Sequence, residues 1–318
     1  MQFLLNDDGS RLGVRTIVAQ ALERNSRLLT QLAGRRGVTP VENLVPELQQ
    51  QGALWRLFLN SPQQSRAEDA GERLQQIQQT LDAAVLGLAE ARRMQDALTN
   101  EDAAEAIHAL NLVAQQLERR LEQDQPRRAL EQLLFVDAAA LRELAADTLD
   151  PGPQDGFETA LAANMTAEAR NAERACGRLL REDAGPDLRL RARRRLQAHL
   201  AQVELFAGSL SEEARRHLWY RNRLLRVLER YAGIDVLLAG LEELVLTRQL
   251  TSREQRLLAA QLVARQASLA PRAERLYRHG FPLQPQAPAL GAAGQLPAAN
   301  ADRLDEPTEL KLRGTALP

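Results

Sequence analysis

Residues 74–98 read LQQIQQTLDAAVLGLAEARRMQDAL and decide the fold class of this 318-residue chain. Apolar residues recur there at alternating intervals of three and four positions, which is the spacing of a heptad seam. This pattern predicts a long amphipathic helix that packs against another helix. The seam comprises Leu74, Ile77, Leu81, Ala84, Leu88, Ala91 and Leu98, interrupted by the polar Gln95.

The next segment continues the pattern and predicts a helical hairpin. Its apolar positions are Ala103, Ile107, Leu110, Ala114, Leu117 and Leu121. The intervening TNED, residues 99–102, offers Thr99 or Asn100 as an N-cap, with acidic residues in the first turn that follows. Because this link is short, we expect the two helices to be antiparallel neighbours.

Helical periodicity and capping residues extend over most of the remaining chain. Ser211 precedes two glutamates, and Thr251 lies three residues before Glu254 in the arrangement of a capping box. No segment has a convincing strand pattern, so we expect an all-α fold of antiparallel helical bundles with coiled-coil-like hairpins. Glycines predict helix ends at Gly34, Gly208 and Gly233. The further predicted helices are near residues 11–33, 41–59, 127–149, 157–182, 187–207, 211–231, 234–249 and 252–278.

The stretch DPGPQDG, residues 150–156, is the strongest interior helix breaker and predicts a domain boundary. It divides an N-terminal helical module, 1–150, from a C-terminal bundle, 157–279. Residues 280–318 are rich in Pro and Ala and predict a disordered tail. Charge follows a similar division, because residues 1–169 carry a net charge of −9 and residues 170–230 a net charge of +7. Whether the two modules form one bundle stays open at this point.

Composition limits the compartment and the chemistry. With one cysteine, Cys176, the chain can form neither an internal disulfide nor a Cys/His zinc cluster. The N-terminus lacks the pattern of a signal peptide, and no apolar run is long enough to span a membrane. We therefore expect a cytoplasmic protein, with secretion without a cleavable signal, or origin as a piece of a longer chain, as alternatives. Lys311 is the only lysine, which indicates either a GC-rich bacterial genome or selection against ubiquitination in a host cell.

The sequence RLRARRRLQAHL, residues 189–200, places five arginines within seven positions of a predicted helix. An outward-facing cluster of this kind would bind phosphates of nucleic acid or polyphosphate. We expect instead that the cluster is solvated or faces the acidic N-terminal module, with an acidic protein partner as a further alternative. From the apolar line through Ala192 and Leu196, we expect Arg193 to flank the seam. The arginines expected to point outward are Arg191, Arg194 and Arg195. The whole cluster consists of Arg189, Arg191, Arg193, Arg194 and Arg195.

The sequence RHLWYRNRLL, residues 216–225, is the preferred candidate for a protein contact. Adjacent helix positions point about 100° apart, so Trp219 and Tyr220 cannot both face one core stripe. Aromatic and arginine residues side by side are typical of interface hot spots. The predicted partner-binding residues are Trp219, Tyr220, Arg221 and Arg223.

No motif for catalysis is visible: the chain lacks a Gly-rich phosphate loop, a Gly-x-Ser-x-Gly elbow and a His-Glu-x-x-His sequence. The segment around His108 resembles a histidine-phosphotransfer helix, with Asn111 in place of the usual lysine and Leu112 in place of the glycine. Glu105 and His108 have metal-ligand spacing but no second Glu-x-x-His. We therefore expect no metal, no cofactor and no enzymatic activity. The leading hypothesis is a bacterial adaptor, secretion-associated factor or effector that binds another protein. An anion-binding regulator and a degenerate phosphotransfer module are the alternatives.

Overall fold

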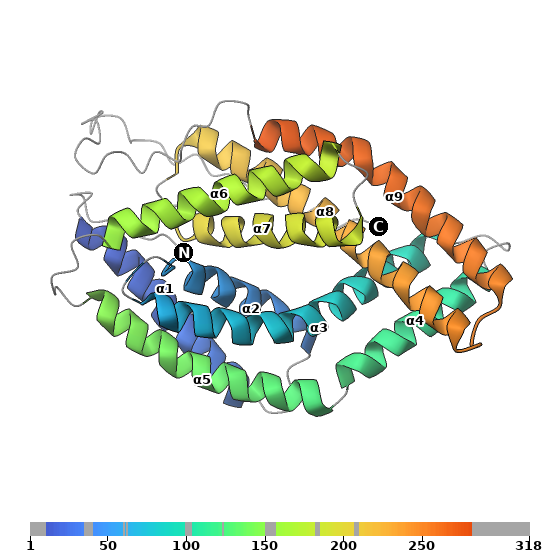
Figure 1. Ribbon diagram of the computed structural model, residues 1–318, viewed down its shortest axis with the longest axis horizontal. Helices are drawn as coiled ribbons and strands as arrows, with labels where there is room; N and C mark the ends of the chain where they lie inside the picture. The colour runs from blue at the N-terminus through green and yellow to red at the C-terminus, as the bar shows by residue number, and fades with distance from the viewer. Residues whose placement is uncertain are drawn as a thin grey trace, which may run out of the picture.

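The computed structural model describes residues 11–34, 41–59, 61, 63–98, 104–122, 124–149, 157–181, 185–206 and 210–281. Every regular element in these residues is a helix, and no strand occurs among them, so the predicted all-α class is confirmed (Figure 1). In chain order the helices are α1 (Arg11–Gly34), α2 (Val41–Arg56), α3 (Gln64–Ala97), α4 (Ala104–Glu122), α5 (Asp124–Leu149), α6 (Phe157–Arg181), α7 (Pro186–Glu204), α8 (Glu212–Leu246) and α9 (Ser252–Gly280).

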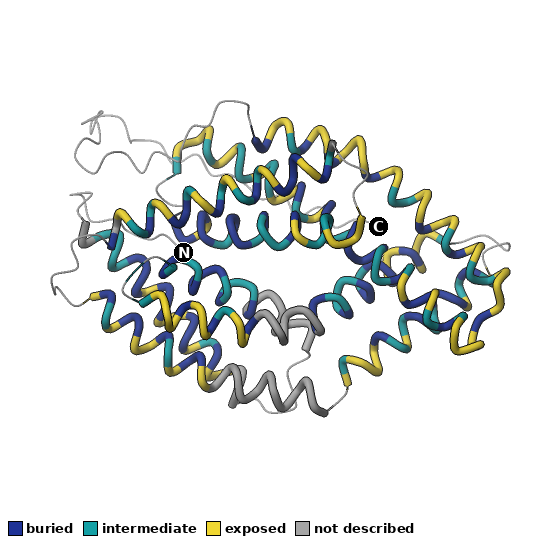
Figure 2. The backbone as a smooth tube through the Cα atoms, in the orientation of Figure 1, coloured by how far each residue is buried: buried dark blue, intermediate teal, exposed yellow. Residues whose placement is uncertain are grey.

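The long helices α3 and α8 connect the two ends of the molecule. At one end α1 lies along α5, and α2 lies against α3 (Figure 1). At the other end α8 packs against α3, α7 and α9, and α4 packs against α3 and α9. Figure 2 shows that α7 is mostly buried or half-buried, whereas the outer surface of α9 is largely exposed.

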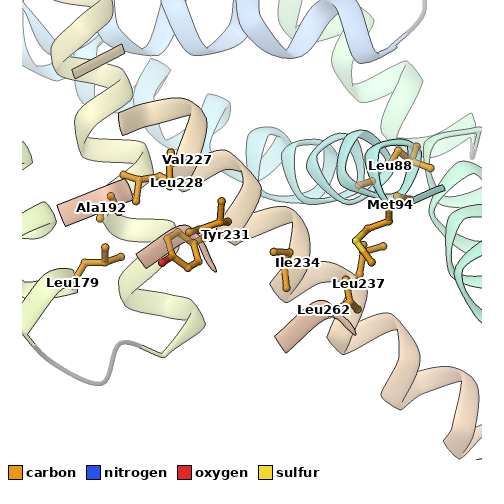
Figure 3. Packing of buried hydrophobic residues seen from close by; sticks show 14 of the residues in the cluster. Leu88, Met94, Leu179, Ala192, Val227, Leu228, Tyr231, Ile234, Leu237 and Leu262 are labelled. Atoms are coloured by element: carbon orange, nitrogen blue, oxygen red, sulfur yellow. The ribbon is translucent and has the colours of Figure 1, made fainter. Parts of the chain in front are cut away.

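Two clusters of buried apolar side chains form the core, and α3 and α6 contribute to both. The first half of α3 places Leu74 and Leu81 in a cluster with α1, α2 and α5. Its second half places Leu88 and Met94 in a cluster with α4, α7, α8 and α9 (Figure 3). Each cluster therefore combines helices from both sides of residues 150–156. That segment lies outside the described residues, and the domain boundary there stays a prediction.

The predicted seam of α3 is buried at Leu74, Leu81, Ala84, Leu88 and Ala91, and Leu98 is half-buried. The side chain of Ile77 lies outside what the structure describes. The buried stripe of α4 differs from the prediction. On α3, Gln95 is exposed and donates from Nε2 to Asn111 Oδ1 of α4 at 2.7 Å. On α4, Ile107 and Ala114 are only half-buried. The stripe is displaced because α4 packs against α8 and α9 as well as α3. The buried residues of α4 are Ala106, Ala109, Leu110, Val113 and Leu117. Knobs-into-holes packing of a coiled coil stays a prediction.

The helix end predicted at Gly233 is wrong, because α8 runs without a break from Glu212 to Leu246. Gly233 lies where α8 crosses α3. A Cβ atom at this position would be 2.7 Å from the backbone oxygen of Leu86 and 2.8 Å from Cβ of Glu90. Glycine is therefore required by the close approach of two helices, which the sequence alone does not distinguish from a helix end.

Other predicted helix ends agree with the structure where it describes them. The hydroxyl of Ser211 accepts a hydrogen bond from the backbone N–H of Ala214 at the start of α8. Thr251 and Glu254 form the capping box of α9, and α1 ends at Gly34. The predicted cap at Thr99 or Asn100, the predicted stop at Gly208 and almost all of the predicted disordered tail, from residue 282 on, lie outside the described residues.

The helix crossing yields a first prediction with a matched control on α3. We expect Gly233→Ala to lower the free energy of unfolding by about 1 to 3 kcal/mol, because the added methyl group must push against backbone. Gly71→Ala has open space around its new Cβ and should raise this free energy by about 0.5 to 1 kcal/mol through helix propensity. Urea unfolding of both variants measures the difference. Equal effects of the same sign would contradict the crossing.

Candidate functional site

Helix α7 carries the arginine run and has neighbours on several sides. It contacts α2, α6 and α8, and its predicted apolar line is buried at Ala192, Leu196, Leu200 and Val203. A helix enclosed in this way cannot direct five guanidinium groups into solvent. The surroundings of each arginine therefore decide what the run can bind.

Arg193 is 1% exposed and forms an ion pair with the buried Asp82 of α3. Its Nη1 donates to Gln197 Oε1 at 3.2 Å, and Gln49 Nε2 of α2 donates to Asp82 Oδ1 at 3.0 Å. Burial lowers the pKa of Arg193 to about 10, and the charge of Glu229 opposes this shift. Arg193 therefore connects α7 to α3 in the interior instead of flanking the seam at the surface.

Arg189 and Arg195 also face carboxylates. Arg189 makes two hydrogen bonds to Asp235 of α8, from Nε to Oδ2 at 2.8 Å and from Nη2 to Oδ1 at 2.7 Å. Arg195 donates from Nη1 to the two oxygens of Glu168 on α6, at 3.3 and 3.1 Å. Arg56, at the end of α2, reaches the same Glu168 Oε1 at 3.4 Å. One carboxylate is thus shared by two guanidinium groups from different helices.

The two remaining arginines of the run have no carboxylate within 4.0 Å in the part of the chain that the structure describes. Arg191 is exposed, whereas Arg194 is half-buried. Burial lowers the pKa of Arg194. Three of the five arginines therefore bind internal acids, whereas Arg191 and Arg194 have no such partner among the described residues.

The predicted partner-binding segment divides into an exposed pair and an internal contact. Trp219 is 49% exposed, and the guanidinium carbon of Arg223 lies 4.0 Å from the centre of its ring. Tyr220 meets Trp219 edge to face at 4.9 Å and stacks on His279 of α9 at 4.9 Å between ring centres. Trp219 and Arg223 are thus accessible to a partner, and the ring of Tyr220 packs against the ring of Trp219.

Arg221 is the internal member of that segment. Its Nε donates to the carbonyl of Gly280 at 2.8 Å, and its Nη1 lies 2.7 Å from Nε2 of His199 on α7. Because arginine can only donate, Nε2 of His199 is the acceptor. Burial raises the pKa of nearby Cys176 to about 12, although the charge of Arg221 opposes this shift. Cys176 is therefore a protonated packing residue, and Arg221 connects α7, α8 and the end of α9.

His108 is exposed on α4, and its Nε2 lies 3.8 Å from Glu254 Oε1 at the start of α9. Glu105, three residues earlier, pairs instead with Arg253 at 3.1 Å. Among the described residues, no three histidine, cysteine or acidic side chains gather as a metal site. The predicted phosphotransfer role of His108 stays a prediction.

Sequence reasoning missed Glu90, a completely buried carboxylate of α3 that pairs with three arginines among the described residues. Arg265 of α9 donates to its Oε1 at 2.7 Å, while Arg93 lies 3.0 Å and Arg230 of α8 lies 3.4 Å from its Oε2. Two of these partners are more than a hundred residues away in sequence. No local spacing could therefore have identified the cluster.

No helix among the described residues is long and apolar enough to cross a membrane. Comparisons of the chain with protein-family models, with curated proteins and with solved structures gave no match.

The Arg193–Asp82 pair yields a second prediction. Removing one partner leaves the other charge buried, so Arg193→Met or Asp82→Leu should each lower the free energy of unfolding by about 3 to 5 kcal/mol. The double variant should regain much of this loss, because no buried charge is left unpaired. Denaturant unfolding of the four proteins measures the coupling, and additive losses in the double variant would contradict a direct pair.

Asp137 yields a prediction on pH. This buried carboxylate of α5 accepts from Gln51 Nε2 at 2.8 Å and lies 3.4 Å from Arg73 Nη2. Burial raises its pKa to about 6, although Arg73 and Gln51 oppose the shift. The folded state then binds the proton more tightly than the unfolded state, so this group's contribution to stability is present below about pH 4 and is lost as the pH rises to about 6.

We therefore expect Asp137→Asn to remove a decline of about 2 kcal/mol in the free energy of unfolding between pH 4 and pH 6.5. Asp147→Asn is the matched control on α5, because the side chain of Asp147 is 43% exposed beside Arg66. Urea titrations at several pH values measure the slope. If the free energy of unfolding still declined over this pH range in Asp137→Asn, a group other than Asp137 would cause the decline.

Proposed function

We propose that this protein is a non-enzymatic helical-bundle protein that acts by binding another protein, as an adaptor, a secretion-associated factor or an effector does. The observation that carries the proposal is the exposed Trp219 with Arg223 stacked over its ring. Tryptophan and arginine are the residues most often found at the energetic centre of protein interfaces.

The two tryptophans of the chain make the contrast clear. Trp55 is 1% exposed in the core, whereas Trp219 is 49% exposed. Among the Phe, Tyr and Trp residues whose side chains the structure describes, the others are buried or half-buried, so the exposure of Trp219 sets it apart. Its ring is also held in place, because Arg223 covers one side and Tyr220 meets it edge to face. A side chain that is already ordered loses less conformational entropy when a partner covers it.

The neighbouring charges favour a partner with an acidic or mixed surface over a purely apolar one. Around Trp219, Arg215, Arg216 and Arg223 are exposed on α8, and Glu212 and Glu213 begin the same helix. Arg216 lies 3.6 Å from Glu212 Oε1 in an exposed pair, which contributes little to stability. Such rim charges steer association and select partners more than they add affinity.

The experiment that tests this proposal compares Trp219→Ala with Leu246→Ala, both in full-length protein. Leu246 is 84% exposed at the other end of α8, so its substitution removes apolar surface without touching the Trp219 surface. Affinity purification from the cells that express the protein, followed by titration of the recovered partner, measures binding. We expect Trp219→Ala to weaken binding about 30-fold or more and Leu246→Ala to leave it unchanged.

The melting temperature should stay the same in both variants, because both side chains lie at the surface. A partner that binds the two variants with the affinity of the wild type would refute docking through Trp219. Loss of binding in both variants together would point to a different surface of α8.

A further inference from the structure

The arginines that surround Glu168 outnumber the acids available to them. Arg56 and Arg195 approach this carboxylate from α2 and α7, and both lie within hydrogen-bonding distance of its Oε1. The Glu168 side chain is only 8% exposed, whereas the side chains of Arg56 and Arg195 are 38% and 42% exposed. Glu168 is thus buried, whereas the side chains of Arg56 and Arg195 remain partly accessible to solvent.

Arg194 adds a third positive charge to the same place. It precedes Arg195 on α7, is half-buried, and has no carboxylate within 4.0 Å among the described residues. Burial lowers the pKa of Arg56, and the negative charge of Glu168 opposes this shift. The positive charges of Arg195 and Arg194 lower the pKa further. The positive charges of Arg194 and Arg195 therefore both act on Arg56, and Arg56 and Arg195 share one carboxylate.

We propose that Arg56, Arg194 and Arg195 form a binding site for a small phosphate-type oxyanion, with inorganic pyrophosphate as the simplest representative. An oxyanion with two or more charges supplies the negative charge that the cluster lacks. Its oxygens accept hydrogen bonds from the guanidinium N–H groups that Glu168 does not engage. Planar guanidinium groups match phosphate oxygens in pairs. The site is independent of docking through Trp219, so either proposal can fail alone.

The surroundings favour a small anion over an extended polymer. Arg194 is half-buried and Glu168 lies below the cluster, so the positive charge is concentrated at one place. Two of the other three arginines of the run are engaged elsewhere: Arg189 binds Asp235, and Arg193 binds Asp82 in the interior, whereas Arg191 is exposed. A nucleic acid backbone requires a row of accessible cations, whereas one di- or triphosphate fits three guanidinium groups.

Isothermal titration of the full chain with pyrophosphate at low salt tests the site, with Arg272→Gln as control because Arg272 is exposed on α9. We expect wild type and Arg272→Gln to bind alike and Arg194→Gln to bind about tenfold more weakly. Glu168→Gln should bind more tightly than wild type, because the competing carboxylate is removed. Arg195→Gln serves in place of Arg194→Gln if the latter does not fold, as judged by circular dichroism.

Three results would overturn the proposal. The first is the absence of pyrophosphate binding by the wild type, and the second is an equal loss in Arg194→Gln and Arg272→Gln, which indicates a diffuse effect of net charge. The third comes from a short DNA duplex added at the same phosphate concentration. Binding of the duplex but not of pyrophosphate, lost in Arg194→Gln, would assign the cluster to a polymer.

Discussion

The close crossing of α8 over α3 at Gly233 is the constraint on which the remainder of the structure depends. Because Gly233 lacks a side chain, the two backbones approach until Leu86 and Glu90 of α3 lie directly under α8. Glu90 is thereby removed from water, and a buried carboxylate needs charged partners. Arg230 of α8 and Arg265 of α9 supply them. Gly233, together with Gly87 on the facing side of α3, thus permits the close helix spacing, and this spacing brings Glu90 to the arginines that attach α9 to the bundle.

The same arrangement recurs at the other buried acids, and it explains why the arginine run is not a simple cationic surface. Asp82 joins α3 to Arg193, and Glu168 joins α6 to Arg195 and Arg56. Each acid receives arginines from neighbouring helices, and the guanidinium group suits this use because it donates in several directions within one plane. Charges counted along the sequence therefore overestimate the charge that faces solvent. Around Glu168 the balance is unequal, because two arginines share one carboxylate and the adjacent Arg194 has no carboxylate within 4.0 Å among the described residues.

Local patterns in the sequence were sufficient for the helices and insufficient for the contacts between them. The seam of α3 and the caps at Ser211 and Thr251 depend on residues within a few positions, so periodicity and capping rules found them. Gly233 was misread because a glycine at a helix crossing and a glycine at a helix end look the same along one chain. Arg193 was placed at the edge of the seam because its partner, Asp82, is remote in sequence. Trp219 was identified as a candidate because its neighbour Tyr220 cannot share its direction on one helix.

Helix α7 connects the two proposed binding surfaces physically. It carries Arg194 and Arg195 in the cluster around Glu168, and its His199 accepts a hydrogen bond from Arg221, two residues after Trp219. This contact requires His199 to be unprotonated, and burial lowers the pKa of His199 to about 3, with the charge of Arg221 lowering it further. The connection therefore persists throughout the neutral pH range and does not act as a pH switch. Communication between the surfaces would need a second arrangement of α7 that one ligand binds better than the other. The buried Arg193–Asp82 pair opposes such a movement, because displacing α7 would separate two charges in the interior.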